Sequence, residues 1–345
     1  MHMETRWSRH EEEELLDIEL LDPESEVSRD RWWRFRVEVD TYDLPYDPPL
    51  PREQTTWWLY MDPGTRCETW VIRDDDGIAA ALRLQLFDDS NRHLAWAAIH
   101  VRPDVRRRGL GRALFGHAVE RARTEDRRTL NVGGPRSDAA AEFADAVGAE
   151  RTQTLLRSVQ RLDQIDRDRL RRLAKRIAKA APQYSLVRWT ERCPDEYLGD
   201  YIHAKNGMLD APVADGIDYE PHEAKPELLR EAEDRNKSIG IKEYVICARD
   251  DTSGEFAGLT QLWNVGGIRT DQGDTAVLRS HRGHRLGVRL KAEMVAWLAE
   301  VDPRVEEVQT FNDPDNEPML RVNRELGYRP SELWDDWTIA VRPPP

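Results

Sequence analysis

Short apolar runs separated by turn-forming clusters dominate residues 68–101. The runs are rich in Val, Ile, Leu and Ala, and the clusters between them are Asp-Asp-Asp-Gly and Asp-Asp-Ser-Asn. Runs that break at Asp, Asn, Ser and Gly are typical of β-strands joined by tight turns. The pattern therefore predicts three strands that pair as an antiparallel meander.

The spacing of apolar residues changes after the meander. Residues 111–125 carry small and apolar side chains three and four positions apart, which predicts an amphipathic helix. A short strand over 128–134, a helix over 137–149 and a strand over 151–162 are expected to follow. The aromatic and proline-rich stretch over 32–60 predicts no clear element.

The same order of elements occurs twice along the chain. Residues 244–267 repeat the meander, and residues 275–298 repeat its last strand, the following loop and the helix. Gly111 in the first loop and Gly287 in the second are 176 residues apart. The Arg-Asp-Asp turns of the two meanders are separated by the same 176 residues. Self-similarity at a fixed offset indicates a repeated fold.

The repeat predicts two domains joined by a connector. We assign residues 1–165 to an N-terminal domain and residues 183–345 to a C-terminal domain of the same type. Residues 166–182 between them are charged and amphipathic, end at proline and predict a connector helix.

The chain is acidic, with a formal net charge of −14 over 345 residues. Nucleic acid and anionic membrane surfaces are polyanions, so this charge disfavours both as partners and is compatible with a cationic amine substrate. No apolar run approaches the roughly eighteen residues of a membrane span, and no export segment is visible. We therefore expect a cytoplasmic protein.

Neither the cysteines nor the histidines form a metal or redox motif. Cys67, Cys193 and Cys247 are odd in number and far apart, which argues against a disulfide framework and against a ligand set. His281 and His284 lie three residues apart in a loop with no third ligand nearby. We expect no metal.

The loop "VRRRGLGRAL", residues 105–114, joins the last strand of the first meander to the helix. Gly109 and Gly111 allow a tight turn in which backbone N–H groups and a helix N-terminus point at one anion, with three arginines beside them. The alternative is a solvated basic loop that happens to contain glycine.

Motifs and element order together resemble the GNAT superfamily of N-acyltransferases. "RRRGLG" fits that family's pyrophosphate motif Arg/Gln-x-x-Gly-x-Gly/Ala, and "RGHRLG" stands at the same place in the second copy. "NEPMLRVNRELGY", residues 316–328, looks like the family's final helix pattern. Two-copy arrangements of this kind resemble mycothiol-synthase-like acyltransferases. The resemblance implies an α/β fold with an α+β mixed sheet: two tandem domains, each with a mostly antiparallel central sheet flanked by helices.

The resemblance also implies acetyl-CoA, or another acyl-CoA, as cosubstrate. In such a fold the loop holds the pyrophosphate, and the strand before it splays from its neighbour so that the pantetheine arm can pair with it. The residues expected to bind the coenzyme are Val101, Arg106, Arg107, Arg108, Gly109, Leu110, Gly111 and Arg112 in the first copy, and Val277, Leu278, Arg282, Gly283, His284, Arg285, Leu286 and Gly287 in the second.

The two copies depart from the family pattern in different ways. The first keeps both loop glycines but has Ser137 in place of the family's asparagine and Ala144 in place of its tyrosine. The second has Arg285 in place of a glycine, which is tolerated if φ is negative there, and Asn323 in place of the tyrosine. In the family that tyrosine commonly protonates the departing thiolate, so here the proton comes from water or another side chain, or the step tolerates a free thiolate.

We predict that the second copy is active on a small amine. Asn316 and Tyr328 keep family-like places beside the thioester, and Asp274 is our candidate base, although a turn aspartate is an equally good interpretation. Asp218 and Glu220 are candidates to bind a cationic substrate, or belong to a solvated loop. The alternative function is a catalytically degenerate module that binds acyl-CoA or a partner protein. The sequence leaves the oligomeric state open.

Overall fold

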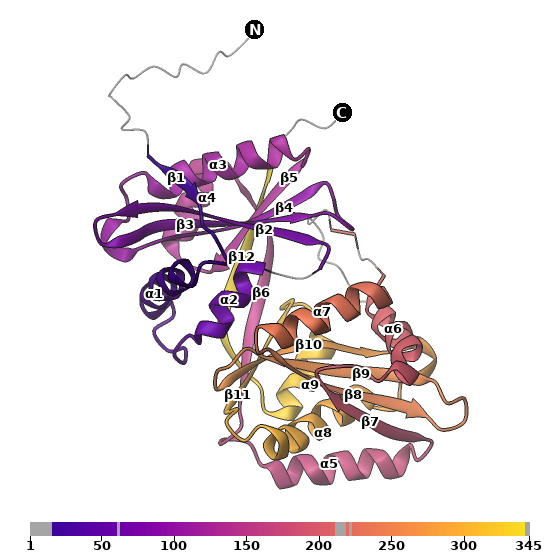
Figure 1. Ribbon diagram of the computed structural model, residues 1–345. Helices are drawn as coiled ribbons and strands as arrows, with labels where there is room; N and C mark the ends of the chain where they lie inside the picture. Colours follow the sequence, from indigo (N-terminus) through magenta and orange to yellow (C-terminus); the bar gives the residue numbers. More distant parts are fainter. Residues whose placement is uncertain (1–15, 61–62, 211–218, 221–222, 342–345) are drawn as a thin grey trace.

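The computed structural model shows two halves joined by one sheet (Figure 1). It describes residues 16–60, 63–210, 219–220 and 223–341. The sheet has twelve strands in the order β1-β2-β3-β4-β5-β12-β6-β11-β10-β9-β8-β7. Helices flank it, which confirms the predicted fold class. We call the elements from β1 to β6 the N-terminal half and those from α5 to β12 the C-terminal half.

Both halves contain the same succession of elements. The N-terminal half consists of β1 (Ile18–Leu20), α1 (Glu26–Asp43), α2 (Arg52–Tyr60), β2 (Thr65–Asp74), β3 (Gly77–Phe87), β4 (Leu94–Val101), α3 (Leu110–Thr124), β5 (Thr129–Pro135), α4 (Asp138–Val147) and β6 (Glu150–Arg161). The C-terminal half consists of α5 (Arg167–Ala180), β7 (Tyr184–Thr190), α6 (Leu198–Asn206), α7 (Pro226–Ser238), β8 (Lys242–Asp250), β9 (Phe256–Asn264), β10 (Arg269–Val277), α8 (Leu286–Val301), β11 (Glu307–Asn312), α9 (Glu317–Leu326) and β12 (Arg329–Ala340).

The predicted meanders are present in both halves as antiparallel strands, β2 to β4 and β8 to β10. The aromatic stretch that predicted no element forms helices α1 and α2. Ser25 caps α1 by accepting from the Ser28 N–H, and Trp32, Phe35 and Val39 on one stripe of the helix are buried. The prolines of this stretch fall between the two helices and at the start of α2, where proline is tolerated.

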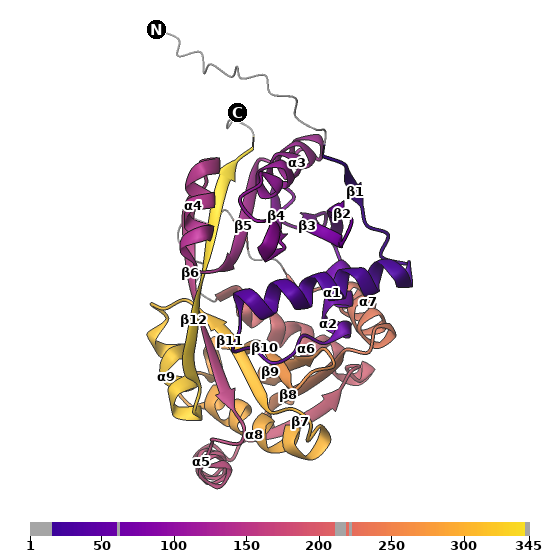
Figure 2. The same cartoon turned by 90° about the vertical axis from the view of Figure 1, so that its left-hand side faces the viewer.

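The two halves exchange their last strands. β6 leaves the N-terminal half and pairs with β11, whereas β12 leaves the C-terminal half and pairs with β5. β6 and β12 also pair with each other, antiparallel, along the middle of the sheet. Figure 2 shows these two long strands passing between the upper and lower halves. The sequence does not predict this exchange, and the domain limits at residues 165 and 183 stay a prediction.

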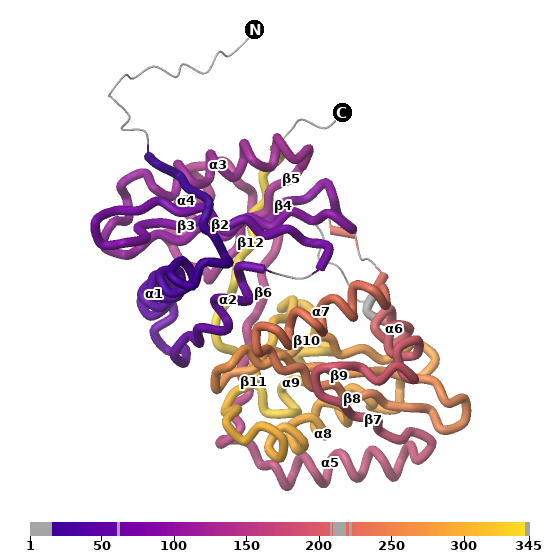
Figure 3. Tube along the Cα trace, in the orientation of Figure 1, coloured from indigo at the N-terminus to yellow at the C-terminus, as the bar shows by residue number. Residues whose placement is uncertain are grey.

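Helices cover both faces of each half. In the N-terminal half, α1 and α2 pack on Val71 and Ala81, and α3 packs on the opposite face with Leu82 and Leu84. In the C-terminal half, α6 covers one face of β8 to β10, while α5 and α8 cover the other. α5, the predicted connector, lies along α8 at the outer end of the molecule (Figure 3) and buries an apolar stripe there.

A buried ionic network also joins the halves. Asp47, in the segment after α1, accepts hydrogen bonds of 2.7 and 2.6 Å from Arg157 of β6 and is paired at 2.7 Å with Arg269 of β10. Burial opposes the charge on Asp47, but its hydrogen bonds with the two guanidinium groups outweigh that effect and lower the pKa of the carboxyl. Arg157 is 2% exposed and also bonds Glu332 of β12.

Two adjacent glycines of β5 test the strand exchange. A Cβ on Gly133 would overlap the carboxylate of Asp336 on β12, whereas a Cβ on Gly134 meets nothing within 4 Å. We expect Gly133→Ala to lower the free energy of unfolding by about 1–3 kcal/mol, because overpacking forces the strands apart. Gly134→Ala is the matched control and should change it by less than about 0.5 kcal/mol. Urea denaturation measures both, and equal effects would contradict the β5–β12 packing.

Candidate functional site

Each half has a gap where two parallel strands separate. β4 pairs with β5 only from Leu94 to Ala97, and β10 pairs with β11 only from Arg269 to Asp271. Beyond these points the strands continue without pairing to each other, as the resemblance to the GNAT superfamily implies. In strands that keep one neighbour, alternate residues direct their backbone N–H and C=O groups away from it. The gaps therefore offer unpaired backbone groups of β4 and β10.

The two glycine loops at the ends of β4 and β10 have the same backbone shape. The first has positive φ at Arg107 (64°) and Gly109 (89°), and the second has positive φ at Gly283 (88°) and Arg285 (58°). The expectation of a negative φ at Arg285 is wrong. Each loop has one arginine and one glycine at these two positions, in opposite order. The second loop therefore adopts the same backbone conformation as the first, although it has one arginine in place of a glycine. A left-handed arginine is uncommon and costs roughly 1–2 kcal/mol.

The loop arginines are held by neighbouring elements. Nε of Arg106 donates to the carbonyl of Val101 at 3.0 Å, and Nε of Arg282 donates to that of Val277 at 3.1 Å. Arg106 also forms a two-pronged pair with Asp43 at the end of α1. The other loop arginines pair with the helix that follows β5 or β11: Arg107 with Glu142, Arg112 with the carbonyl of Ala146, and Arg285 with Glu325.

The remaining predicted coenzyme residues surround the same two loops. Leu110, Gly111, Leu286 and Gly287 form the first turns of α3 and α8, where the N–H groups have no partner within the helix. Arg108 donates to the carbonyl of Asp104, and the exposed His284 lies against Tyr184. Leu278 follows β10 and donates its N–H to Ala257.

The two loops differ in the space beside them. A Cβ on Gly111 would lie 3.4 Å from Phe143 of α4 and 3.7 Å from Val101. A Cβ on Gly287 would lie 3.9 Å or more from its nearest neighbours. Val322 stands in the repeat where the first half has Phe143. The loop of the C-terminal half therefore has more room for a ligand.

A β-bulge places Asp274 at the gap of the C-terminal half. The register of β10 against β9 shifts between Gln272 and Thr275, so that Gly273 and Asp274 share one partner position. Asp274 pairs with Lys205 of α6 at 2.7 Å. The pairing of β3 with β4 in the N-terminal half runs without such a shift.

Lys205 belongs to a polar cluster on the face that α6 covers. Its ammonium bonds Gln261 Oε1 at 3.0 Å as well as Asp274, and the Tyr201 hydroxyl donates to the same Gln261 oxygen at 2.9 Å. At the point where β10 leaves β11, Asp271 accepts a 2.6 Å hydrogen bond from Gln309, and burial raises the pKa of this carboxyl.

Glu243 of β8 is a titratable group that sequence reasoning missed. It is 7% exposed and lies opposite Trp263 of β9, on the same face as the Lys205 cluster. Burial raises the pKa of Glu243 to about 7, against the attraction of the Lys205 ammonium. The one signal in the sequence is a glutamate within an apolar run, "EYVICA". A carboxyl that titrates near neutrality is suited to general base catalysis.

The corresponding face of the N-terminal half is cationic. Cys67 has the strand position of Glu243, and burial raises the pKa of its thiol to about 11. Arg36 of α1 bonds the half-buried His100 of β4, and loss of solvation holds the pKa of that imidazole well below its usual value. Arg83 of β3 is also half-buried, and its charge acts on the same imidazole. The acidic cluster of the C-terminal half thus has no equivalent among these residues.

The other predicted catalytic residues lie on the α8 and α9 side of the sheet. Asn316 caps α9 by accepting from the Met319 N–H. Tyr328 is buried, which raises the pKa of its hydroxyl, and its ring lies 4.7 Å from the ammonium of Lys291. Lys291 Nζ donates to Oδ1 of Asn323 at 2.8 Å. Within the described part of the chain, neither Asn316 nor Tyr328 forms a hydrogen bond or ion pair with the Lys205 cluster.

The two predicted substrate residues belong to the segment before α7. Asp218 lies outside the described residues. The side chain of Glu220 is exposed. Its backbone N–H donates to Oδ1 of Asn91 and its carbonyl accepts from Nδ2 of the same residue, which lies in the β3–β4 connection of the other half. Its neighbour Tyr219 is closer to the acidic cluster, since burial and then the charge of Asp274 raise the pKa of its hydroxyl.

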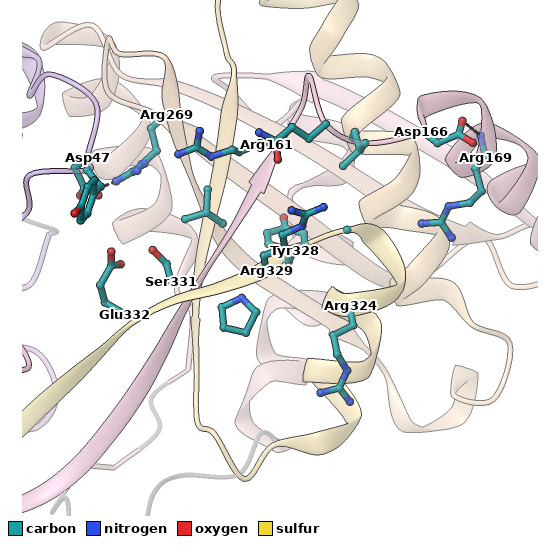
Figure 4. A pocket seen from close by; sticks show the side chains of 16 residues that line it. Asp47, Arg161, Asp166, Arg169, Arg269, Arg324, Tyr328, Arg329, Ser331 and Glu332 are labelled. Atoms are coloured by element: carbon teal, nitrogen blue, oxygen red, sulfur yellow. Dashed lines mark hydrogen bonds and ion pairs between the residues drawn. The ribbon is translucent and has the colours of Figure 1, made fainter.

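A cavity of about 750 Å³ lies between the halves, beside the start of β12 (Figure 4). Five arginines line it, but Arg269 is paired with Asp47 and Arg324 with Glu317. Tyr328 is the only predicted site residue on its wall. The Lys205 cluster, Glu243 and the two glycine loops therefore lie outside this cavity.

Two further properties bear on the function. Among the described residues, no cluster of three or more His, Cys, Asp or Glu side chains could hold a metal ion. No helix in the described part of the chain is both long and apolar enough to cross a membrane.

Comparisons with known proteins agree with the repeat. The sequence model of the acetyltransferase (GNAT) family matches residues 27–149, which run from α1 to the end of α4. A tandem GNAT protein from the clavulanic acid biosynthesis pathway, solved without AcCoA, is 30% identical, with a TM-score of 0.80 over 96% of this chain and 100% of that one. A comparison with curated proteins finds no significant match.

More distant structures share the fold. A GCN5-related N-acetyltransferase from Sphaerobacter thermophilus is 16% identical, with a TM-score of 0.67 over 95% of this chain and 96% of that one. A putative acetyltransferase from Pyrococcus horikoshii is 12% identical, with a TM-score of 0.56 over 99% and 92% of the two chains. At these identities the similarity concerns the fold alone.

Replacing Lys291 by Met is expected to stabilise the chain at pH 7. Burial lowers the pKa of Lys291 from 10.5 to about 7, so the unfolded chain binds more protons between these two values. Folding of the wild type is therefore penalised most below pH 7, and its stability rises from pH 7 towards 10.5. The variant lacks this dependence and should gain on the order of 1 kcal/mol or more at pH 7.

Urea denaturation at pH 7 and pH 9 measures this difference. The advantage of Lys291→Met should shrink at pH 9, while Lys175→Met, on the exposed side of α5, should follow the wild type at both values. An advantage that is the same at both pH values would show that the lysine does not titrate in this range.

Proposed function

The chain belongs to the GNAT family of acetyltransferases, and on that premise we propose that its C-terminal half transfers an acyl group, most simply acetyl, from coenzyme A to a small amine. The transfer is direct, from the thioester to the amine nitrogen, without a covalent intermediate on the protein. The N-terminal half has a mainly structural role in this proposal.

The observation that carries the proposal is the acidic cluster at the β10–β11 gap. Glu243 and Asp274 face this region from β8 and β10, and the Lys205 ammonium pairs with Asp274 and attracts Glu243. Asp271 lies on the same face, where the charges of Arg269 and Arg157 act on it. The two carboxyl groups around the single ammonium of Lys205 favour a cationic acceptor over an anionic one. An amine bound there would lie next to the unpaired backbone of β10.

The loop of the C-terminal half fits a pyrophosphate. The first-turn N–H groups of α8 are unpaired within the helix, and the helix dipole favours an anion at that end. Space is open at Gly283 and Gly287, where a Cβ would have no close contact. Arg282 and Arg285 are exposed beside this turn. The Arg285 guanidinium is paired with Glu325, so in this proposal it exchanges that carboxylate for a phosphate when the coenzyme binds.

Acyl-coenzyme A, when bound, supplies a thioester carbonyl for attack. Glu243 is the base in this proposal: its carboxylate takes a proton from the ammonium form of the acceptor and makes the nitrogen lone pair available. Asp274 holds Lys205 in place, and that ammonium limits the rise in the pKa of Glu243. Unpaired N–H groups of β10 can donate to the carbonyl oxygen as negative charge develops on it.

The alternative is a chain that binds acyl-coenzyme A without turning it over. Asn323 in the place of the family's tyrosine is the observation in its favour. Release of the coenzyme thiol from acetyl-CoA, measured against a panel of diamines, amino sugars and amino-acid amides, separates the two. Amine-dependent release supports the enzyme, and binding without release supports the alternative.

Two glycines distinguish the coenzyme sites. We expect Gly287→Val to weaken binding of coenzyme A by tenfold or more, because the added methyl groups fill the space next to the phosphate-facing N–H groups. Gly111→Val is the matched variant in the N-terminal half and should leave this affinity unchanged. Calorimetric titration with coenzyme A measures both. Loss of binding in Gly111→Val alone would assign the coenzyme to the N-terminal half.

The pH dependence of turnover identifies the base. If Glu243 is the base, kcat/KM should rise with pH through about 7, because the carboxylate must be deprotonated to accept a proton. Glu243→Gln should lower kcat by about 10²-fold or more and remove this limb of the profile. Glu300→Gln, on the exposed side of α8, is the control.

Asp274→Asn separates our two candidate bases. The negative charge of Asp274 raises the pKa of Glu243. Asp274→Asn should therefore shift the rise of kcat/KM with pH to lower pH, and the rise itself should remain. A profile that loses the limb in Asp274→Asn and keeps it in Glu243→Gln would assign the base to Asp274.

A further inference from the structure

Lys291 is a buried ammonium group without a carboxylate partner. Its side chain is 3% exposed, between α8 and α9. Among the described residues its polar contacts are Oδ1 of Asn323 at 2.8 Å and the ring face of Tyr328 at 4.7 Å. No charged side chain offsets the cost of burying it, and burial alone accounts for its lowered pKa.

This lysine is connected to the strand that borders the gap. Asn323, itself 2% exposed, donates from Nδ2 to Oδ1 of Asn312 at 2.7 Å. Asn312 ends β11, three residues after Gln309, the last residue that pairs with β10. The chain of contacts from Lys291 through Asn323 therefore reaches the part of β11 that lines the gap.

The other side of the sheet holds the acidic cluster. Gln309 and Asp271 bond each other on the α6 face, whereas Val308 packs in the core formed with α8. Because side chains alternate along a strand, Asn312 lies on the same face as Val308. Among the described residues, the gap thus has the carboxyl groups on one face, and on the other face the ammonium of Lys291 is linked to it through Asn323 and Asn312.

An apolar side chain at position 291 would pack in this core without the cost of burying a charge. Removal of a buried, unpaired charge is stabilising in general, so its presence indicates a role that packing does not supply. A departing thiolate is an anion that such a group can stabilise and protonate.

We propose that Lys291 is the catalytic acid of the C-terminal half, donating a proton to the coenzyme sulfur as the thiolate leaves. This inference rests on the proposed acyl transfer and supplies the proton donor that the missing tyrosine leaves open. A bond forms between the amine nitrogen and the acyl carbon, and the carbon–sulfur bond breaks with its electron pair on sulfur. Glu243 takes one proton from the ammonium before attack and passes it to water, and it takes the second from the nitrogen as the amide forms. The sulfur takes its proton from Lys291, which regains one from water, so that one proton in all is released to solvent.

The ionisation of bound coenzyme A tests this directly. A nearby ammonium should lower the pKa of the bound thiol, which ultraviolet absorbance of the thiolate reports in a pH titration of the holo complex. We expect Lys291→Met to reduce the thiolate fraction at pH 7 about tenfold, a shift of one pKa unit. Lys175→Met should leave it unchanged.

A second variant separates acid catalysis from a structural role. Lys291→Gln can keep the hydrogen bond to Oδ1 of Asn323 but has neither the charge nor the proton. If the lysine only joined α8 to α9, Gln would restore the wild-type thiol pKa and turnover. We expect Gln and Met to be equally impaired in both, with coenzyme affinity nearly unchanged.

The outcomes are distinguishable from those of the proposed function. Coenzyme A that binds with the same thiol pKa in the wild type and both variants would overturn the role of Lys291 and leave the acyl transfer standing. Failure of the wild type to bind coenzyme A would overturn the proposed function, and this inference with it.

Discussion

Each half completes its sheet with a strand from the other. Without β12 the strand β5 would be an exposed edge, and without β6 so would β11; an edge strand with unpaired N–H and C=O groups is a site of aggregation. The exchange covers both edges with long antiparallel strands. The pairing fixes the register of β11, and with it the point at which β10 and β11 separate. The candidate site therefore depends on strands from both halves.

The halves share one fold but not one chemistry. A single extra residue in β10, at Gly273 and Asp274, creates a bulge that the corresponding strand β4 lacks. That bulge brings a carboxylate to the gap, while the buried glutamate at position 243 corresponds to a cysteine in the first half. Phe143 lies close to Gly111 in the first glycine loop, and valine has the corresponding position, 322, in the second half. The proposed assignment of the chemistry to the C-terminal half rests on these differences.

Local patterns were readable from the sequence, and long-range partners were not. The meanders and the helices after the loops follow from apolar period and turn residues, which act within a few positions. The splayed strands were expected only from the resemblance to the GNAT superfamily. The strand exchange was not predictable, because "RTQTLLRSVQRL" reads as a strand whichever half it pairs with. The loop motif located the two glycine loops, and the binding of a coenzyme by their residues stays a prediction. Glu243 and Lys291 were missed because their chemistry arises from burial, which the tertiary structure determines.

The order of strands gives the tandem arrangement a topological meaning. Two separate copies of one half could satisfy the same pairing as a twofold-symmetric, strand-swapped dimer. The covalent link keeps the two partners at high effective concentration, so assembly does not depend on how much protein is present. In a homodimer every substitution occurs in both subunits. The covalent link removes this constraint, because each half of the fused chain has its own sequence. In the fused chain, one half can gain a bulge or lose a base while its partner keeps the original residue.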